Sequence, residues 1–157
     1  MQPKKNERIP KKRIIILIVT VFVAAFIFVQ SMLPKSVSAR ESDWVTDRVL
    51  NPALAVFGLG PFTYNAVRKT AHVAEFFLLE LLLVFCFRGR TAVAFGTGYL
   101  AAFLDESIQL LSDRGAMIAD VWIDLIGVSA GLLLGVVLLR GITADRRTGH
   151  VIRRRMV

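Results

Sequence analysis

Cysteine and histidine are scarce in this sequence, which has one cysteine, Cys86, and two histidines among its 157 residues. A single cysteine cannot form an intramolecular disulfide, and we interpret Cys86 as a small apolar packing residue. The sequence also lacks a glycine-rich phosphate-binding loop and any recognisable nucleophile motif around a serine or the cysteine. These absences remove the commonest sequence signals of a nucleotide-binding or nucleophilic enzyme.

Charge is nearly absent from several long apolar runs, although the whole chain has a net charge of +8. Hydrophobic residues make up 55% of the sequence, which is too apolar for an ordinary soluble domain and indicates one integral membrane domain. The basic residues gather at the two termini and in one short loop, beside the apolar runs. This distribution is a membrane-topology signal, and we expect membrane lipids rather than nucleic acid as partners.

Four segments are long enough to cross a bilayer as helices, and they cover residues 14–33 and about 66–87, 91–111 and 117–139. The sequence therefore predicts an all-α membrane protein with four transmembrane helices. Between the first two helices, residues 35–66 are too apolar to extend into water as a free loop. We expect a short interfacial helix or two there, broken at Pro52 and at residues 58–61.

Most of the 20 lysines and arginines lie in residues 1–13, at 88–90 and after residue 139. Positive charge marks the cytoplasmic side of a membrane protein, so both termini are expected in the cytoplasm. The predicted organisation is a cytoplasmic basic tail at 1–13, a four-helix membrane domain at 14–139 and a second cytoplasmic basic tail at 140–157. It places the polar ends of the later helices in the outer half of the membrane.

The N-terminal region also fits a signal peptide cleaved after Ala39, with a basic start, an apolar stretch and small residues at 37–39. The apolar stretch is longer than usual for a signal peptide, and Lys35 separates it from the cleavage site. We therefore favour an uncleaved first helix. Sequencing the N-terminus of the membrane-extracted protein distinguishes the two, because cleavage would leave Arg40 first.

Polar residues recur at helical spacing within three of the predicted spans. The stripes are Arg68, His72 and Glu75 on the second helix, Gly98, Asp105 and Gln109 on the third, and Asp120 and Asp124 on the fourth. The fourth helix continues its stripe with Gly127, Gly131 and Gly135, a small-xxx-small pattern that lets another helix approach closely. Each stripe is expected to face the interior of the bundle.

An isolated charge at the centre of a bilayer costs about 2.5 to 3.5 kcal/mol, so these acids must pair, protonate or face water. Two interpretations are compatible with the stripes. One is an ion-pair and hydrogen-bond network that fixes helix packing, and the other is an outward-facing pocket for an envelope lipid or a peptide-bearing ligand. The acids outnumber Arg68, Lys69, His72 and Arg114, and this excess favours a binding site.

Catalysis would need a further arrangement of the same side chains. His72 beside Glu75 or an aspartate forms a base with an orienting carboxylate, and the candidate catalytic residues are His72, Glu75, Asp105 and Asp120. The same four residues would also be the ligands of a metal ion, but a His-x-x-Glu pattern without a second histidine is a weak metal signal. We therefore predict neither a metal nor a cofactor. Glu80, which lies deeper, is expected to be paired across the bundle or protonated.

The polar residues form a combined pattern that resembles the VanZ-like membrane proteins in order and spacing over about residues 66–135. The pattern reads Arg68-Lys69-x-x-His72-x-x-Glu75-Phe76, Asp105-Glu106-x-x-Gln109, Arg114 and Asp120-x-x-x-Asp124-x-x-Gly127. The resemblance implies a small four-helix protein of the bacterial cell membrane, whose namesake accompanies glycopeptide-resistance genes and lowers sensitivity to teicoplanin. It supplies no reaction. One position departs, because Asp124 stands where the family usually has asparagine.

The resemblance and the stripes together lead us to expect recognition of an amphiphile at the outer leaflet, such as a lipid-linked wall precursor or a lipoglycopeptide. The expected ligand-binding residues are Arg68, Lys69, His72, Glu75, Asp105, Glu106, Gln109, Arg114, Asp120 and Asp124. The basic side chains would hold phosphate or carboxylate groups and the acids would hold amines. The alternatives are a membrane enzyme for acid/base hydrolysis or group transfer on a lipid-linked substrate, and a structural partner of another membrane protein. The sequence does not indicate an oligomeric state.

Overall fold

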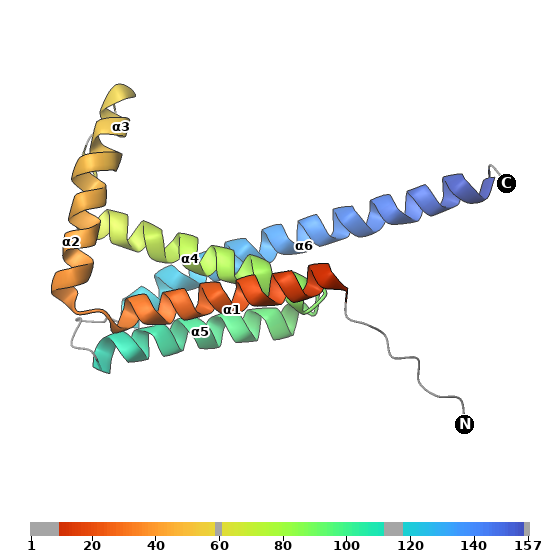
Figure 1. Ribbon diagram of the computed structural model, residues 1–157, viewed down its shortest axis with the longest axis horizontal. Coiled ribbons are helices and arrows are strands. Elements are labelled where there is room, and N and C mark those ends of the chain that lie inside the picture. Colours follow the sequence, from red (N-terminus) through yellow and green to blue (C-terminus); the bar gives the residue numbers. More distant parts are fainter. Residues whose placement is uncertain (1–9, 59–60, 112–117, 156–157) are drawn as a thin grey trace.

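The computed structural model describes residues 10–58, 61–111 and 118–155, which are almost entirely helical and contain no strand (Figure 1). The elements in chain order are α1 (Lys11–Met32), α2 (Lys35–Val45), the π-helical turn η1 (Thr46–Leu50), α3 (Asn51–Val56), α4 (Tyr64–Cys86), α5 (Thr91–Leu111) and α6 (Ile118–Arg155). The all-helical fold class predicted from the sequence is confirmed.

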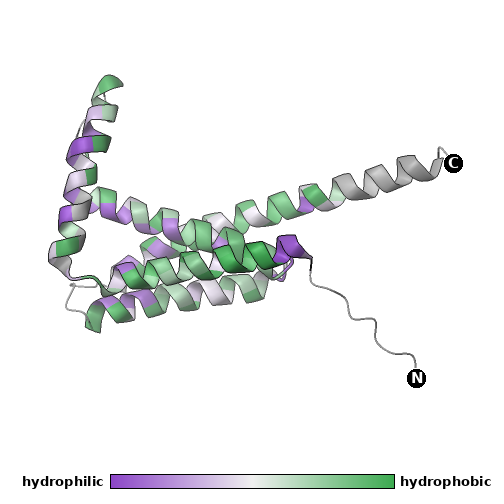
Figure 2. Cartoon of the chain, viewed as in Figure 1, coloured by the Kyte–Doolittle hydropathy of each residue, from purple (hydrophilic) through white to green (hydrophobic). Residues whose placement is uncertain are grey.

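Helices α1, α4, α5 and the first part of α6 run alongside one another as a bundle, and α4 and α6 form its most extensive contact (Figure 1). The small apolar core includes Ile27, Phe76, Val84 and Val128. Many large apolar side chains are exposed on the outside of the bundle, and Phe22, for example, is 70% exposed. Hydrophobic residues occur along all the helices of the bundle (Figure 2). By length and composition, α1 and the segment Asp120–Ala144 of α6 qualify as membrane-crossing helices. An apolar exterior of this extent indicates a membrane protein.

Helices α2 and α3, joined through η1, stand across one end of the bundle (Figure 1). The predicted break at Pro52 is wrong, because the backbone stays helical from η1 through Pro52 into α3. The π-helical turn immediately before it has a wider backbone, in which the Asn51 N–H donates to the carbonyl of Thr46. The helical segment ends at Val56, and Gly58 follows with a φ of +68°.

The fourth predicted span ends at residue 139, whereas α6 continues to Arg155 and projects beyond the other helices (Figure 1). The start of α1 and the turn between α4 and α5 lie toward that same end of the bundle. In the turn, Arg88 and Gly89 have φ values of 56° and 79°, and the Gly89 N–H donates to the Val84 carbonyl at 3.0 Å. The polar residues of the predicted stripes lie toward the opposite end of the bundle.

The contact between α4 and α6 is made at the glycine stripe of α6. A Cβ atom at Gly127 would meet the backbone carbonyl oxygen of Val73, and one at Gly131 would meet that of Phe77. At Gly135 the nearest atom would be the Cβ of Val84, at 2.9 Å. The three glycines therefore let the α6 backbone approach α4 more closely than any other residue would allow.

Candidate functional site

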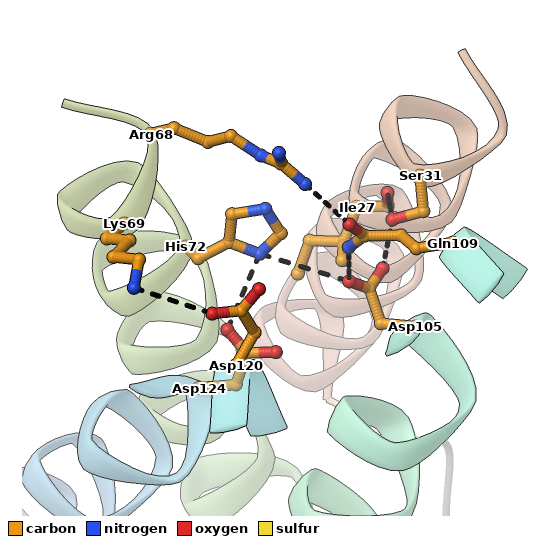
Figure 3. A network of polar contacts seen from close by, with 9 residues as sticks. All are labelled: Ile27, Ser31, Arg68, Lys69, His72, Asp105, Gln109, Asp120 and Asp124. Atoms are coloured by element: carbon orange, nitrogen blue, oxygen red, sulfur yellow. Dashed lines mark hydrogen bonds and ion pairs between the residues drawn. The ribbon is translucent and has the colours of Figure 1, made fainter. Parts of the chain in front are cut away.

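Side chains from four helices meet at the end of the bundle remote from the 88–90 turn (Figure 3). This polar cluster consists of Ser31 from α1, Arg68, Lys69 and His72 from α4, Asp105 and Gln109 from α5, and Asp120 and Asp124 from α6. Helical periodicity explains the convergence. Asp105 and Gln109 continue the buried face of α5 that begins with Ala94, Gly98 and Ala102, so small residues give way to polar ones along one stripe.

A chain of hydrogen bonds crosses the cluster from the α4 side to α1 (Figure 3). Arg68 Nη2 donates to Gln109 Oε1 at 2.8 Å, and Gln109 Nε2 donates to Asp105 Oδ2 at 2.6 Å. The Ser31 hydroxyl donates to the other oxygen of Asp105. Gln109 and Asp105 are 0% exposed, so the chain fixes the Asp105 carboxylate away from water in one orientation.

His72 lies between two carboxylates without hydrogen bonding to either. Its Nδ1 is 3.4 Å from Asp124 Oδ1 and 3.9 Å from Asp105 Oδ2, and both distances exceed the range of a good N–H···O bond. Within the described residues, His72 Nδ1 and Asp124 Oδ2 are buried and have no hydrogen-bond partner. Polar atoms left in this state destabilise a fold, and most proteins avoid them.

Four other predicted site residues lie on the helices that form this centre. Lys69 Nζ is 3.6 Å from Asp120 Oδ1, and because the two side chains are 50% and 22% exposed, the ion pair adds little stability. Glu106 is buried and its Oε2 has no hydrogen-bond partner among the described residues. Glu75 is half-buried on the same helix as His72. Arg114 lies outside the described residues.

The structure changes the set of residues that could hold a metal ion. The sequence suggested His72, Glu75, Asp105 and Asp120, whereas the donor atoms that gather within 4.8 Å of one another belong to His72, Asp105 and Asp124. Asp124 lies one turn further into the bundle than Asp120 and is 1% exposed. Asp120 points instead to Lys69.

Sequence reasoning missed Ser31, although a weak signal was present. The buried residues of α1 are Thr20, Ile27 and Ser31, which follow one stripe at spacings of seven and four residues. Two of the three are polar, although residues 14–32 contain only one other polar residue, Gln30. This pattern identifies the face of α1 that packs on the bundle and therefore the serine that reaches Asp105.

Replacing Ser31 with alanine is expected to lower the free energy of unfolding by about 1 to 3 kcal/mol, because Asp105 loses a buried donor. Chemical denaturation in detergent measures the change. Ser107→Ala on α5 is the control, since among the described residues the Ser107 hydroxyl bonds only to the Phe103 carbonyl of its own helix. Equal stabilities of the two variants would contradict a contribution from the Ser31–Asp105 contact.

The comparison with known protein families gives one match. The model of the family described as VanZ/LLP1 matches residues 14–139, which include every residue of the polar cluster. No curated protein and no solved structure matches the chain.

Proposed function

The chain belongs to the VanZ/LLP1 family, and from this premise we propose that it is a multi-pass protein of the bacterial cell membrane whose polar cluster binds the headgroup of an amphiphile. In this proposal α1, α4, α5 and α6 cross the membrane and both termini are cytoplasmic. The basic residues near the start of α1, in the 88–90 turn and after residue 139 support this orientation. The polar cluster then faces the outer side.

Helices α4 and α5 are less apolar than α1, but their dimensions and outer faces suit a bilayer. They have 23 and 21 residues, which is enough to span the hydrocarbon core. Their outer faces carry apolar side chains such as Leu78, Leu100 and Phe103, while Glu80, Asp105 and Gln109 point inward. Charges that lower the hydropathy of these helices are thus kept from lipid.

The observation that supports ligand binding is the set of buried polar atoms at one end of the bundle that have no hydrogen-bond partner in the described part of the chain. They are His72 Nδ1, Glu106 Oε2, Asp120 Oδ1 and Asp124 Oδ2. Carboxylate oxygens in this state would accept hydrogen bonds from an amine, and Arg68 and Lys69 beside them suit a phosphate or carboxylate. A lipid-linked wall precursor and a lipoglycopeptide such as teicoplanin both combine such groups with an alkyl chain.

Binding can be measured with the purified full chain in nanodiscs, using a lipid-linked pentapeptide precursor and teicoplanin as separate probes. We expect His72→Gln and Asp105→Asn to weaken binding of the true ligand at least tenfold, because these residues hold the centre of the cluster. Asp43→Asn on α2 is the control, since this exposed acid lies outside the cluster.

The outcomes separate the interpretations. If the variants reach the membrane normally and bind both probes as the wild type does, this ligand class is wrong. If they disappear from the membrane, the cluster is a structural network.

The glycine stripe is already in contact with α4, so we do not propose that it docks another membrane protein.

A second candidate is a membrane enzyme for acid/base hydrolysis or group transfer on a lipid-linked substrate. The position of the His72 imidazole between the carboxylates of Asp105 and Asp124 favours it, because this arrangement suits a general base. Turnover by the purified chain with a bell-shaped pH profile, lost in His72→Gln, would support this candidate. Binding without turnover would leave the recognition function.

A further inference from the structure

The polar cluster contains three donor atoms whose spacing suits a shared ion. Around a tetrahedral metal ion with bonds of about 2.1 Å, neighbouring ligand atoms are about 3.4 Å apart. His72 Nδ1 is 3.4 Å from Asp124 Oδ1 and 3.9 Å from Asp105 Oδ2. We propose that His72, Asp105 and Asp124 bind one divalent transition-metal ion, through Nδ1 and one carboxylate oxygen of each aspartate.

An ion accounts for two observations that direct hydrogen bonding does not. A histidine that donated to either aspartate would approach it to about 3 Å, yet Nδ1 is buried and has no hydrogen-bond partner within the described residues. Two aspartates that are 0% and 1% exposed also face each other across a single imidazole. A divalent ion would neutralise both carboxylates and leave the imidazole neutral, as a ligand requires.

The residues around Asp105 hold its carboxylate in place by hydrogen bonds, as residues next to the ligands of a metal site commonly do. Gln109 donates to Asp105 Oδ2, and Ser31 donates to Asp105 Oδ1, so the orientation of this carboxylate is set from α1 and α5. Arg68 in turn holds the side-chain oxygen of Gln109 at 2.8 Å. Asp124 Oδ2 has no partner among the described residues and is available to complete the coordination or to meet a bound ligand.

The donor set selects the class of ion. One imidazole nitrogen with two carboxylate oxygens suits Zn²⁺, Mn²⁺ or Fe²⁺, whereas Mg²⁺ and Ca²⁺ prefer sites made only of oxygen. The ion would be bound at the position where the headgroup of the proposed amphiphile binds. Ion binding is nevertheless independent of that ligand and is measured without it, so either proposal can fail while the other stands.

The test uses the full chain, purified in detergent, stripped of metal with a chelator and then dialysed. Titration calorimetry with ZnCl₂ and MnCl₂, followed by elemental analysis after gel filtration, is expected to give one ion per chain. Asp124→Asn and His72→Gln should weaken binding at least about tenfold. At equal ion concentration the ion should also raise the Tm of the wild type more than that of Asp124→Asn.

Glu80→Gln is the matched control, because it converts another buried acid to an amide on α4, about 12 Å along the helix from His72. It should bind the ion as the wild type does. The proposal is overturned if the wild type binds neither ion in stoichiometric amount, or if Asp124→Asn and Glu80→Gln bind equally. Circular dichroism establishes that each variant is helical, and a wild type that binds neither ion overturns the proposal even where a variant does not fold.

Discussion

A Gly127→Ala variant is expected to lose about 3 kcal/mol of unfolding free energy, because a single added methyl group would enter the backbone of α4. The new Cβ would meet the Val73 carbonyl oxygen and would lie 3.0 Å from the Phe77 nitrogen. Backbone atoms inside a helix cannot swing aside as a flexible side chain can. The two helices would have to separate, and the pairing of α4 with α6 is the most extensive contact of the bundle.

Thermal or chemical denaturation in detergent measures the loss, and Gly141→Ala on the same helix is the control. A Cβ at Gly141 meets nothing within 4 Å, so this change should stabilise the chain by up to about 1 kcal/mol through helix propensity alone. The two substitutions are therefore expected to change the unfolding free energy in opposite directions. If Gly127→Ala were as stable as Gly141→Ala, the close approach of α6 to α4 would be wrong.

The helices could be predicted from the sequence because apolar runs and their interruptions determine them. The run at 14–33 corresponds to α1 at Lys11–Met32, which ends before Pro34, and the run at 91–111 corresponds to α5. The continuation of the helix through Pro52 could not be predicted in this way. It depends on a local π-helical turn, which has no compositional signature.

The candidate site could be predicted in part. Spacing identified the acids that share a helix face, but it could not rank Asp120 and Asp124, which lie one turn apart on the same side of α6. The packing of α4 and α5 distinguishes them, since Asp124 is 1% exposed beside His72 and Asp120 lies beside Lys69. Asp124, predicted from the sequence as a binding residue that departs from the family pattern, lies beside His72 in the cluster.

The contribution of Ser31 shows a different limit. A serine in an apolar helix usually donates to the carbonyl four residues before it, and Ser31 Oγ lies 3.1 Å from the Ile27 carbonyl oxygen, so its single hydrogen is shared with a second acceptor. Nothing local to α1 indicates that the same hydroxyl also reaches Asp105, which is 74 residues away in sequence. Only the packing of α1 on α5 brings them together.

Glu80 leads to the second large expected effect, a gain in stability when the acid is removed. The side chain is 0% exposed, and neither carboxyl oxygen has a hydrogen-bond partner in the described part of the chain, so the predicted pairing across the bundle is not found there. The carboxyl group fits against α5 because Gly98 has no Cβ at that point. Glu80→Met keeps the volume and removes a buried polar group, and we expect it to raise the unfolding free energy by about 2 kcal/mol.

The contrast with a partnered acid makes this expectation specific. Asp105→Leu also replaces a fully buried carboxylate with an apolar side chain, but it removes the acceptor of two buried hydrogen bonds, those from Ser31 and Gln109. It should therefore destabilise the chain by about 3 kcal/mol in the same denaturation experiment. If Glu80→Met were equally destabilising, Glu80 would have a partner that the described residues do not include. If Glu80→Met is more stable than the wild type and still binds the metal ion, Glu80 is not part of the site at the end of the bundle.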